Sequence, residues 1–232
     1  MKTDSRIIRE FAWPNPIDNY EAKLRVAQKV AALLKDGDVV GVGSGSTSFI
    51  AIGVLAERAK KENLRCLAIP TSHEMTFACA AAGLPVTSLW EHTPDWCFDG
   101  ADEVDPALNL IKGRGGAMFR EKLVMRASAR SYILIDESKR VDRLGHKFAI
   151  PVEVLPATLP IVESSLLSLG ATEIILRLAK KKDGPVITEQ GNFILDVRFK
   201  EIGASLERDI KAITGVLESG LFWGFPVEIL QA

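Results

Sequence analysis

The amino-acid sequence predicts an α/β fold, in which a mostly parallel sheet has helices on both faces and a smaller α+β domain follows it. Two observations lead to this prediction. Up to about residue 146, short apolar runs alternate with segments of helical periodicity, the pattern of a parallel sheet covered on both sides. Beyond that residue the expected order becomes strand, helix, strand, strand, helix, strand. The first pattern indicates a Rossmann-like fold and the second a ferredoxin-like one.

The first part of the chain begins with a helix, which Asp18 and Glu21 would open as a capping box and which ends before Gly37. A further helix is expected over residues 47–61, which are rich in Ala, Leu and Glu, and another near residues 72–82, which stops at Gly83. The short apolar runs that we interpret as strands are residues 38–42, 65–69, 85–89, 96–98 and 131–135.

The second part is expected to be a small lid domain over residues 146–222, while residues 1–145 and 223–232 form the larger catalytic domain. Gly-Pro and Gln-Gly-Asn turns separate its central strands. The expected strands are residues 151–156, 171–181, 192–199 and 215–222, and the expected helices are residues 159–170 and 205–213.

Composition and charge exclude several classes of protein. The net charge is -1, and no basic stripe of the kind that binds nucleic acid is present. No apolar run approaches the ~20 residues of a membrane span. The N-terminus is charged and lacks the apolar stretch of a secretory signal. We therefore expect a cytoplasmic protein with no nucleic-acid and no membrane partner.

The cysteines and histidines do not have the spacing of metal ligands. The three cysteines form no C-x-x-C pair, which favours reduced thiols in a cytosolic protein. The three histidines likewise form no ligand pattern. We therefore expect no bound metal. The residues in question are Cys66, Cys79, Cys97, His73, His92 and His146.

A glycine-rich loop, GVGSGSTS, occupies residues 41–48 between a predicted strand and a predicted helix. The backbone N–H groups of such a turn, and the helix N-terminus after it, favour a phosphate. The loop has Ser46 where a dinucleotide-binding loop has its third glycine, and it lacks the lysine of a P-loop. The sequence thus predicts N–H and O–H donors for a small phosphate or sugar. The alternative is a tight turn whose hydroxyls cap the helix.

Four carboxylates follow a predicted strand in the stretch FDGADEVD, residues 98–105. Carboxylates at a strand end can accept hydrogen bonds from sugar hydroxyls or act as proton acceptors. Their spacing does not match the alternating ligands of an EF-hand. Taken alone, the stretch fits a solvated acidic turn at least as well as a site.

The stretch IKGRGGAMFREK, residues 111–122, combines a lysine, a glycine-rich loop and a helix expected to begin near Gly116. Glu121 would lie near the boundary of the core, where partial burial can tune the pKa of a general base. The alternative is an exposed helical face formed by Glu121 and Lys122. The residues of this helix expected to face the core are Phe119, Leu123, Val124 and Ala127.

A further lysine, Lys139, follows the predicted strand at residues 131–135 and could bind a phosphate as a point charge or lie in a solvated turn. Every polar cluster described so far follows a predicted strand. Since ligands of open α/β sheets bind at the carboxyl ends of the strands, these clusters could converge on one site.

In this order, the segments resemble the ribose-5-phosphate isomerase family of the A type. GVGSGSTS is similar to the substrate loop of that family, DGADEVD to its aspartate segment and KGRGGAMFREK to the glycine loop before its catalytic glutamate. IPTSHEMT, DESKRVDRLG, PVEVLP, GNFILDVRF and GVLESGLF also match. The resemblance extends from about residue 20 to the end, and residues 1–18 match nothing in it. Each motif is moderately specific, but the ordered set is highly specific.

The resemblance implies the reversible conversion of D-ribose 5-phosphate to D-ribulose 5-phosphate through an enediolate, without cofactor or metal, in the non-oxidative pentose phosphate pathway. It implies that Glu121 is the base between C2 and C1, that Asp99 and Asp102 assist ring opening, and that Lys112 stabilises the negative oxygens. It implies a homodimer or homotetramer. The residues that it implies in substrate binding are Ser44, Gly45, Ser46, Thr47, Gly100, Ala101, Gly113, Arg114, Gly115 and Lys139.

One residue departs from the family's pattern, because Arg114 stands where glycine is usual. We expect a negative φ at Arg114, a guanidinium directed away from the reacting carbons, and a sharp turn made by Gly113, Gly115 and Gly116. Two other functions remain open. An aminosugar-phosphate deaminase would be expected to present a different set of acid and base residues. A non-catalytic sugar-phosphate sensor would want a helix-turn-helix segment and a basic face.

Overall fold

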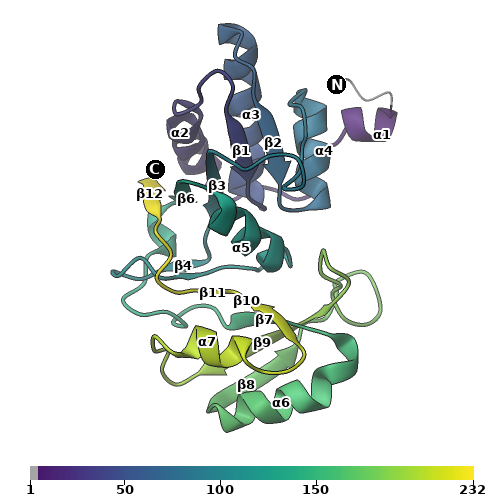
Figure 1. The fold of residues 1–232 in the computed structure, drawn as a ribbon, viewed down its shortest axis with the longest axis vertical. Coiled ribbons are helices and arrows are strands. Elements are labelled where there is room, and N and C mark those ends of the chain that lie inside the picture. The colour runs from purple at the N-terminus through teal and green to yellow at the C-terminus, as the bar shows by residue number, and fades with distance from the viewer. Residues whose placement is uncertain (1–4) are drawn as a thin grey trace. The chain divides into compact units, whose positions relative to one another are not determined.

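The computed structural model describes residues 5–232, which form two compact units (Figure 1). Unit 1 comprises the chain up to Gly100, Arg120–Ser138 and Pro226–Ala232. Unit 2 comprises Ala101–Phe119 and Lys139–Phe225. Within the described residues, no helix is long and apolar enough to cross a membrane.

The boundaries between the two units differ from the domain boundaries predicted from the sequence. Residues 101–119 and 139–145 were expected in the larger domain, whereas their contacts lie in unit 2. The reason is that residues 103–111 form a sheet with residues 221–222. The functional division into 1–145 with 223–232 and 146–222 stays a prediction.

A five-stranded parallel sheet forms the centre of unit 1. Its order is β12-β6-β3-β1-β2, and each neighbouring pair is parallel. From β1 the chain goes outward to β2 and then returns to β3 on the other side of β1, so the strand order reverses between β1 and β3. The predicted Rossmann-like sheet is confirmed. The strands are β1 (Val39–Val42), β2 (Leu67–Pro70), β3 (Trp96–Gly100), β6 (Ser131–Ile135) and β12 (Glu228–Gln231).

Helices cover both faces of this sheet, as the alternation of side chains along β1 shows. A Cβ atom at Gly41 would lie 2.4 Å from Val124 Cγ1 of α5, so one face packs on α5. Val40 and Val42 point the opposite way and belong to the core to which α2, α3 and α4 contribute. The helices of unit 1 are α1 (Arg6–Arg9), α2 (Tyr20–Ala31), α3 (Ser46–Glu62), α4 (His73–Ala82) and α5 (Met118–Ala127), whose first two residues belong to unit 2.

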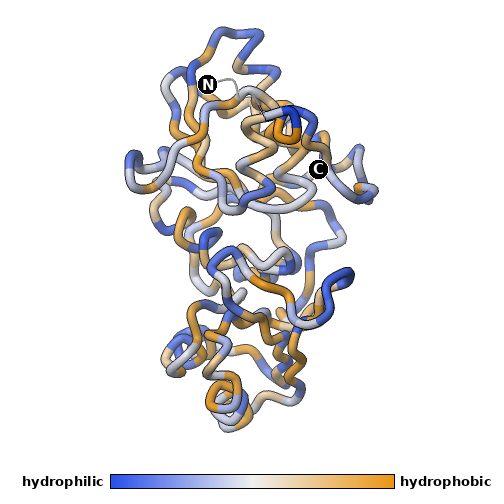
Figure 2. Tube along the Cα trace, turned by 90° about the vertical axis from the view of Figure 1, so that its right-hand side faces the viewer, coloured by the Kyte–Doolittle hydropathy of each residue, from blue (hydrophilic) through white to orange (hydrophobic). Residues whose placement is uncertain are grey.

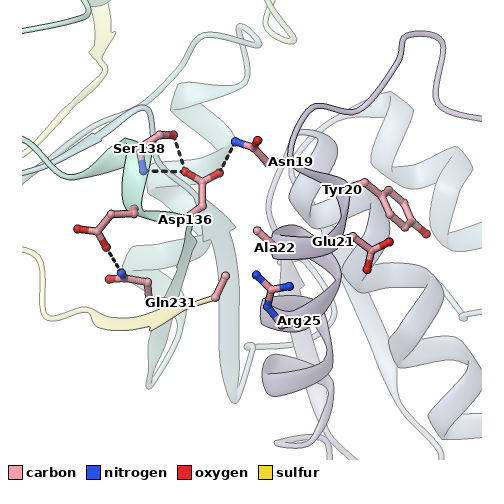
Figure 3. A pocket seen from close by; sticks show the side chains of 10 residues that line it. Asn19, Tyr20, Glu21, Ala22, Arg25, Asp136, Ser138 and Gln231 are labelled. Atoms are coloured by element: carbon pink, nitrogen blue, oxygen red, sulfur yellow. Dashed lines mark hydrogen bonds between the residues drawn. The ribbon is translucent and has the colours of Figure 1, made fainter.

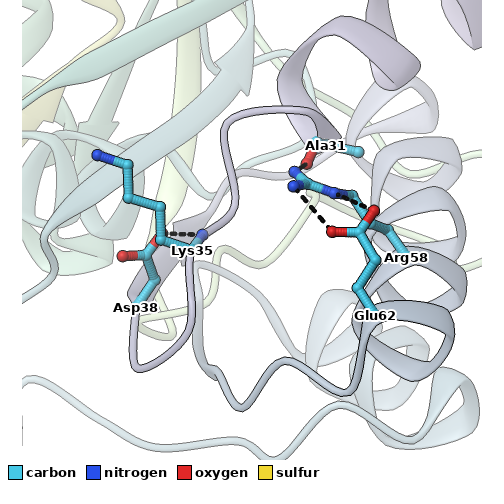
Figure 4. A network of polar contacts seen from close by, with 5 residues as sticks. All are labelled: Ala31, Lys35, Asp38, Arg58 and Glu62. Carbon is cyan, nitrogen blue, oxygen red and sulfur yellow. Dashed lines mark hydrogen bonds and ion pairs between the residues drawn. The ribbon is translucent and has the colours of Figure 1, made fainter.

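Polar contacts fix the end of α2 and the turn before β1 (Figure 4). Arg58 of α3 donates from Nη1 to the carbonyl oxygen of Ala31 and pairs with Glu62 one turn away, Nε to Oε1 3.1 Å. This donation adds to the hydrogen bond from the Leu34 N–H at a carbonyl that has no partner within the helix. In the turn, Asp38 Oδ2 accepts from Trp96 Nε1 of β3 (2.8 Å). The end of α2 is thus tied to α3, and the turn before β1 is tied to β3.

A four-stranded antiparallel sheet with two helices forms most of unit 2. Its order is β10-β7-β9-β8 and its connections run β-α-β-β-α-β, so the predicted ferredoxin-like domain is confirmed. One face of the sheet forms an apolar core with the helices. The elements are β7 (Ile150–Val154), η2 (Pro156–Thr158), α6 (Leu159–Ser168), β8 (Ala171–Leu176), β9 (Phe193–Phe199), α7 (Leu206–Lys211) and β10 (Val216–Ser219).

A small sheet in unit 2 has the order β11-β5-β4, with β4 (Glu103–Val104), β5 (Leu110–Ile111) and β11 (Leu221–Phe222). The single strand expected over residues 215–222 is therefore divided between two sheets. The division falls at Gly220, where a Cβ atom would lie 2.1 Å from the carbonyl oxygen of Lys112. In Figure 2, several of the loops that project outward are hydrophilic.

Two further details of the predicted elements in unit 1 were wrong. The expected strand at residues 85–89 is an irregular segment with one bridge, from Val86 to Ala68. Pro85 supplies a carbonyl oxygen to this edge but has no N–H for a regular ladder. The helix expected to open with a capping box at Asp18 is α2, and it begins at Tyr20. Its N-cap is Asn19, which has φ +54° and donates from Nδ2 to Asp136 Oδ2 (3.3 Å).

Candidate active site

The glycine-rich loop after β1 and the acidic end of β3 lie side by side where the strand order reverses, the usual place for ligands in such sheets. The N–H of Gly43 donates to the carbonyl oxygen of Phe98 (2.8 Å). A Cβ atom at position 43 would lie 2.0 Å from Asp99 Cγ, so only glycine fits there. Asp99 is 3% exposed, and its Oδ1 accepts from the N–H of Gly100 (2.7 Å). The structure thus brings two of the predicted clusters together within unit 1.

Hydroxyl groups of this loop surround the N-terminus of α3. Gly45 precedes the helix with φ +120°, and no side chain in residues 5–232 caps it. Instead, Ser44 Oγ lies 2.8 Å from Thr71 Oγ1, and Lys23 Nζ donates to Ser46 Oγ (2.9 Å). The alternative in which the hydroxyls cap the helix is therefore wrong. The N–H groups of the first turn and the Lys23 ammonium group form a positive region that favours an anion.

The remaining predicted residues near these two strands are half-buried or buried. Thr47 lies in the first turn of α3 and is half-buried. Gly100 ends β3, and Ala101 follows it as a buried residue of unit 2. Asp102 is half-buried, and its N–H donates to the carbonyl oxygen of Ile111 (2.8 Å).

Two other carboxylates of the acidic stretch have structural roles in unit 2. Glu103 is fully buried and accepts from the N–H groups of Gly145 (2.6 Å), Lys147 and Phe148 (2.7 Å). Three backbone donors compensate the burial of this charge. The carboxylate of Asp105 accepts from the backbone N–H of Asn109 (2.8 Å) and from the side-chain amide Nδ2 of Asn109 (3.0 Å). The interpretation of the whole stretch as a solvated turn is therefore wrong.

Glu121 lies in the first turn of α5 and is 4% exposed. The neighbouring Lys122 is also buried, whereas Leu123, expected in the core, is exposed. The helix begins at Met118, two residues later than expected from the sequence. The alternative in which Glu121 and Lys122 form an exposed face is wrong. Burial of a carboxylate costs free energy and is one way in which proteins prepare a general base.

Lys112 follows β5 in unit 2 and is 3% exposed. Its N–H donates to the carbonyl oxygen of Gly220 (2.9 Å), which holds its backbone against the start of β11. Its ammonium Nζ lies 5.6 Å from the centre of the Phe222 ring, within the range of a cation–π interaction. A buried ammonium group held in this way can act on a negative charge that develops nearby.

The glycine loop that follows Lys112 forms a turn closed by a hydrogen bond from Gly116 N–H to the Gly113 carbonyl oxygen (3.1 Å). Gly113 and Gly116 have φ +97° and +85°. Arg114 has no positive φ and its side chain is exposed, so its expected conformation is confirmed. Gly115, expected in the sharp part of the turn, has no positive φ either.

Arg177 and Ile194 of unit 2 both lie against this turn. Arg177 donates from Nη1 to the carbonyl oxygens of Gly113 (3.1 Å) and Arg114 (2.9 Å), and it also binds the carboxylate of Asp196. A Cβ atom at Gly116 would lie 3.4 Å from Ile194 Cδ1. The loop is therefore packed at both ends of the turn.

Near Gly116, a buried carboxylate supports the neighbouring turn. Thr188, whose Cα is 4.0 Å from the position of a Cβ atom at Gly116, donates from Oγ1 to Glu153 Oε1 (2.6 Å). Asn192 Nδ2 donates to the same oxygen (3.1 Å). Burial raises the pKa of the Glu153 carboxyl, as does the nearby Glu218, while the two hydrogen bonds act in the opposite direction.

Lys139 is the last residue of η1 (Glu137–Lys139) and belongs to unit 2. It is half-buried, and its Nζ lies 5.8 Å from the centre of the Phe148 ring. The alternative in which Lys139 lies in a solvated turn is therefore wrong.

A hollow of about 580 Å³ lies in unit 1 at the start of α2 and the end of β6 (Figure 3). Asn19 and Ser138 both donate to the carboxylate of Asp136, from opposite sides. None of the residues predicted as site residues lines this hollow, whose lining is Asn19, Tyr20, Glu21, Ala22, Arg25, Asp136, Glu137, Ser138, Gln231 and Ala232.

Three residues that contact the predicted loops were missed in the sequence. Lys23 sits within a regular amphipathic helix, and nothing in that pattern distinguishes it from a surface lysine. Thr71 lies in IPTSHEMT, which contributed to the resemblance but had no residue assigned. Arg177 is 64 residues away from Gly113, so only the folded chain connects them.

Comparison with known proteins agrees with this arrangement. The model of the ribose 5-phosphate isomerase A (phosphoriboisomerase A) family matches residues 67–232. The ribose-5-phosphate isomerase A of Methanothermobacter thermautotrophicus is 46% identical over 85% of this chain and 89% of the relative. That of Methanocaldococcus jannaschii is 43% identical over 89% of this chain and 92% of the relative.

Solved structures give the same answer. Ribose 5-phosphate isomerase A from Methanocaldococcus jannaschii is similar with a TM-score of 0.88 and 41% identity, covering 92% of this chain and 96% of that one. A D-ribose-5-phosphate isomerase in complex with phospho-erythronic acid has a TM-score of 0.87 and 36% identity, with the same coverage. The chain belongs to the ribose 5-phosphate isomerase A family.

Proposed function

We propose that this protein catalyses the reversible isomerisation of D-ribose 5-phosphate to D-ribulose 5-phosphate. The observation that carries the proposal is that three of the four charged residues assigned to the chemistry, Asp99, Lys112 and Glu121, are each less than 5% exposed. Burial of charges costs free energy, so their burial calls for a reason beyond solubility. The relatives are named as this isomerase, and one similar structure holds an acid that, like the substrate, carries a phosphate.

The isomerisation moves two protons and leaves the composition of the sugar unchanged. Asp99 and Asp102 assist the opening of the ring, in which the proton of the C1 hydroxyl passes to the ring oxygen. Glu121 then takes the proton from C2, the electron pair forms the C1–C2 double bond, and O1 becomes negative. The same carboxyl returns its proton to C1, while the proton on O2 passes to O1 and leaves a ketone at C2. Each proton returns to the sugar, so no co-reactant is consumed.

Lys112 stabilises the negative charge on the enediolate oxygens. A fixed donor of this kind contributes about 3 kcal/mol to the transition state when its position is set before the reaction. The N–H groups of Gly113, Arg114 and Gly115 bind the same end of the substrate. The scheme uses neither a metal nor a cofactor.

The phosphate end of the substrate is bound by the loop of Ser44, Gly45, Ser46 and Thr47 in this proposal. Its support is the helix N-terminus with donor side chains around it. Lys23 joins the set because its ammonium already contacts Ser46. Lys139 adds a second cation, as the resemblance implies.

Two alternatives are disfavoured. An aminosugar-phosphate deaminase is disfavoured because the chain belongs to the isomerase family. A sugar-phosphate sensor without catalytic activity has no need for a buried base, a buried cation and a buried carboxylate. Retention of all three favours the enzyme.

The test is direct. Metal-free protein, treated exhaustively with chelator, is incubated with ribose 5-phosphate, and ketose formation is followed. We expect conversion to equilibrium with ribulose 5-phosphate. Absence of ketose would overturn the function, and activity that returns only when a divalent metal is added would overturn the metal-free scheme.

The assembly and location are also proposals. A homodimer or homotetramer is implied by the family, and sedimentation velocity would distinguish these from a monomer. A cytoplasmic location is supported by Cys66, Cys79 and Cys97, which are reduced cysteines outside any disulfide of the described residues, as is usual in a reducing compartment.

A further inference from the structure

Arg177 holds the glycine loop of unit 2 through both carbonyls of its turn. Its Nη1 donates to the carbonyl oxygens of Gly113 (3.1 Å) and Arg114 (2.9 Å). Its Nε donates to Asp196 Oδ2 (2.8 Å), and its Nη2 donates to the other carboxylate oxygen. The two side chains are 17% and 26% exposed. The planar guanidinium group therefore uses one edge for the carboxylate and the remaining nitrogen for the loop.

The direction of these two carbonyls determines where two N–H groups point. All peptide bonds of the described chain are trans, and in a trans peptide the N–H points opposite to the C=O. The N–H groups of Arg114 and Gly115 belong to the two peptide units that Arg177 binds, so they point away from the guanidinium. Within the described chain neither N–H has an acceptor, while that of Gly116 is bonded to Gly113. The turn thus presents two consecutive donors, as the first turn of a helix does.

We propose that Arg177, itself held by Asp196, is a positioning residue that fixes these two N–H groups toward the negative oxygen of the reacting sugar. This inference rests on the proposed function, in which the turn binds the substrate. Donors that are fixed before the charge develops require no reorganisation during the reaction, which is why their alignment affects the rate. Arg177 acts through the loop and has no contact with the substrate, since its side chain lies on the carbonyl side of the turn.

Lysine cannot replace Arg177 in this role. Its ammonium group is a single point charge without a planar fork, so it cannot bind both oxygens of Asp196 and the two carbonyls in the same geometry. Arg177→Lys nevertheless keeps the charge and most of the volume, so a change in activity reports on geometry.

The matched control is Arg198→Lys. Arg198 of β9 pairs with Glu173, Nε to Oε2 3.2 Å, and its other nitrogens lie 3.5 Å from the carbonyl oxygens of Gly145 and Lys147. It is thus a second arginine that joins a carboxylate to two loop carbonyls in unit 2, at a loop without predicted substrate contacts.

Two quantities are measured on wild type and both variants at equal folded fraction. The first is the steady-state rate with ribose 5-phosphate. Since a displacement of about 1 Å can cost ~100-fold, we expect Arg177→Lys to lower kcat by at least about tenfold with a smaller change in KM. The second is hydrogen exchange of the Gly116 amide, which closes the turn, and we expect it to become at least about tenfold faster. Arg198→Lys should leave both unchanged within about twofold.

An unchanged kcat in Arg177→Lys, or an equal loss in Arg198→Lys, would overturn the proposal. A lower kcat with unchanged Gly116 exchange would also overturn it, because the effect would then not pass through the turn. If Arg177→Lys does not fold, Asp196→Asn leaves Arg177 in place and removes only its charged partner, with the same two readouts and a smaller expected effect. If the wild type forms no ketose, the proposed function fails, and the exchange of Gly116 still decides whether Arg177 holds the turn.

Discussion

The two glycine-rich loops of this protein use glycine for different physical reasons. In the loop after β1, Gly43 is required by space, because Asp99 occupies the place of any side chain. In the turn after Lys112, Gly113 and Gly116 are required by conformation, because both have positive φ. At Gly43 the limit is volume, whereas at Gly113 and Gly116 it is the backbone angles, as it also is at Gly45 of the first loop, which has φ +120°.

The difference extends to what holds each loop in place. The first loop continues directly from β1, and its partner Asp99 lies on the adjacent strand, so the sheet itself fixes both. The second depends on hydrogen bonds from Arg177, which is remote in the sequence. We therefore expect the first loop to be sensitive to added volume and the second to lost hydrogen bonds.

The largest expected effect is that of Glu121→Gln. Glu121 lies in α5, outside both loops, and the loss of activity in this variant is the reference for the losses expected from the loop variants. The amide keeps the shape of the side chain and removes the proton acceptor, so kcat should fall by about 10²–10⁴-fold with a smaller change in KM. Steady-state kinetics with ribose 5-phosphate measure this. The exposed Glu163→Gln on α6 is the control and should be neutral. A folded Glu121→Gln with near-normal kcat would move the role of the base to another group, first of all Asp99.

Gly43→Ala tests the limit of volume in the first loop. Its methyl group would lie 2.0 Å from Asp99 Cγ, so the loop or the carboxylate must move by about an ångström, and kcat/KM should fall by ~100-fold. Gly53→Ala is the control, since a Cβ atom there meets nothing within 4 Å. Within a helix that exchange should leave activity unchanged and raise stability by about 0.5–1 kcal/mol. If Gly43→Ala had the same kcat/KM as the wild type, Asp99 would not need to be held against the loop.

Lys23→Ala tests whether the first loop binds the phosphate. Hydrogen bonds to charged groups are worth about 1.5–3 kcal/mol, so KM for ribose 5-phosphate should rise by roughly tenfold or more. Lys139→Ala should act in the same direction. Lys29→Ala is the control, because Lys29 lies on the same helix and donates to the carbonyl oxygen of Gln231.

Unphosphorylated ribose should be a very poor substrate for the wild type, since binding of the remote phosphate positions the reacting carbons. Comparable turnover of ribose would contradict the assignment of a phosphate site to this loop.

The sequence predicted the first loop well because its geometry is local. Strand, glycine loop, helix and the acidic end of a neighbouring strand follow from periodicity and from the rule for parallel sheets. The ferredoxin-like order was read in the same way. The errors occurred where tertiary contacts override local patterns: Asn19 replaces Asp18 at the helix start because it binds Asp136, 117 residues away.

The second loop shows what the sequence could not provide. Its lysine, its glycines and the ordinary φ of Arg114 were expected, but the rotation of α5 that exposes Leu123 and buries Lys122 was not. Arg177 and Asp196 were read only as parts of strands. Their role depends on the meeting of Arg177, directly after β8, with Asp196 of β9, and no spacing along one strand indicates it.

A smaller effect is expected from Glu153→Gln, which tests the support of the turn near Gly116 through pH. Burial raises the pKa of this carboxyl above its ordinary value of 4.5, so the folded state binds the proton more tightly than the unfolded chain. The resulting stability is fully present below the unfolded-state pKa and is lost as pH rises through the raised folded-state pKa. The variant should therefore gain stability relative to wild type at pH 8 and lose part of the pH dependence, measured as Tm between pH 4 and pH 8. An equal gain at pH 4 and pH 8 would show that the carboxyl is not the source.

The smallest effect is expected from Arg114→Gly, which restores the residue usual in the family. Arg114 is exposed and has no positive φ, so glycine relieves no strain and removes no buried contact. The carbonyl at position 114 is a backbone group, so its hydrogen bond from Arg177 survives the substitution. We therefore expect kcat within a few-fold of wild type and a small loss of stability, because glycine loses more conformational freedom on folding. A direct role of the guanidinium in substrate binding would instead lower kcat/KM by at least about tenfold, or 1.4 kcal/mol. Comparison of kcat in Arg114→Gly and Arg177→Lys therefore distinguishes the exposed side chain on the turn from the side chain that holds the turn by hydrogen bonds.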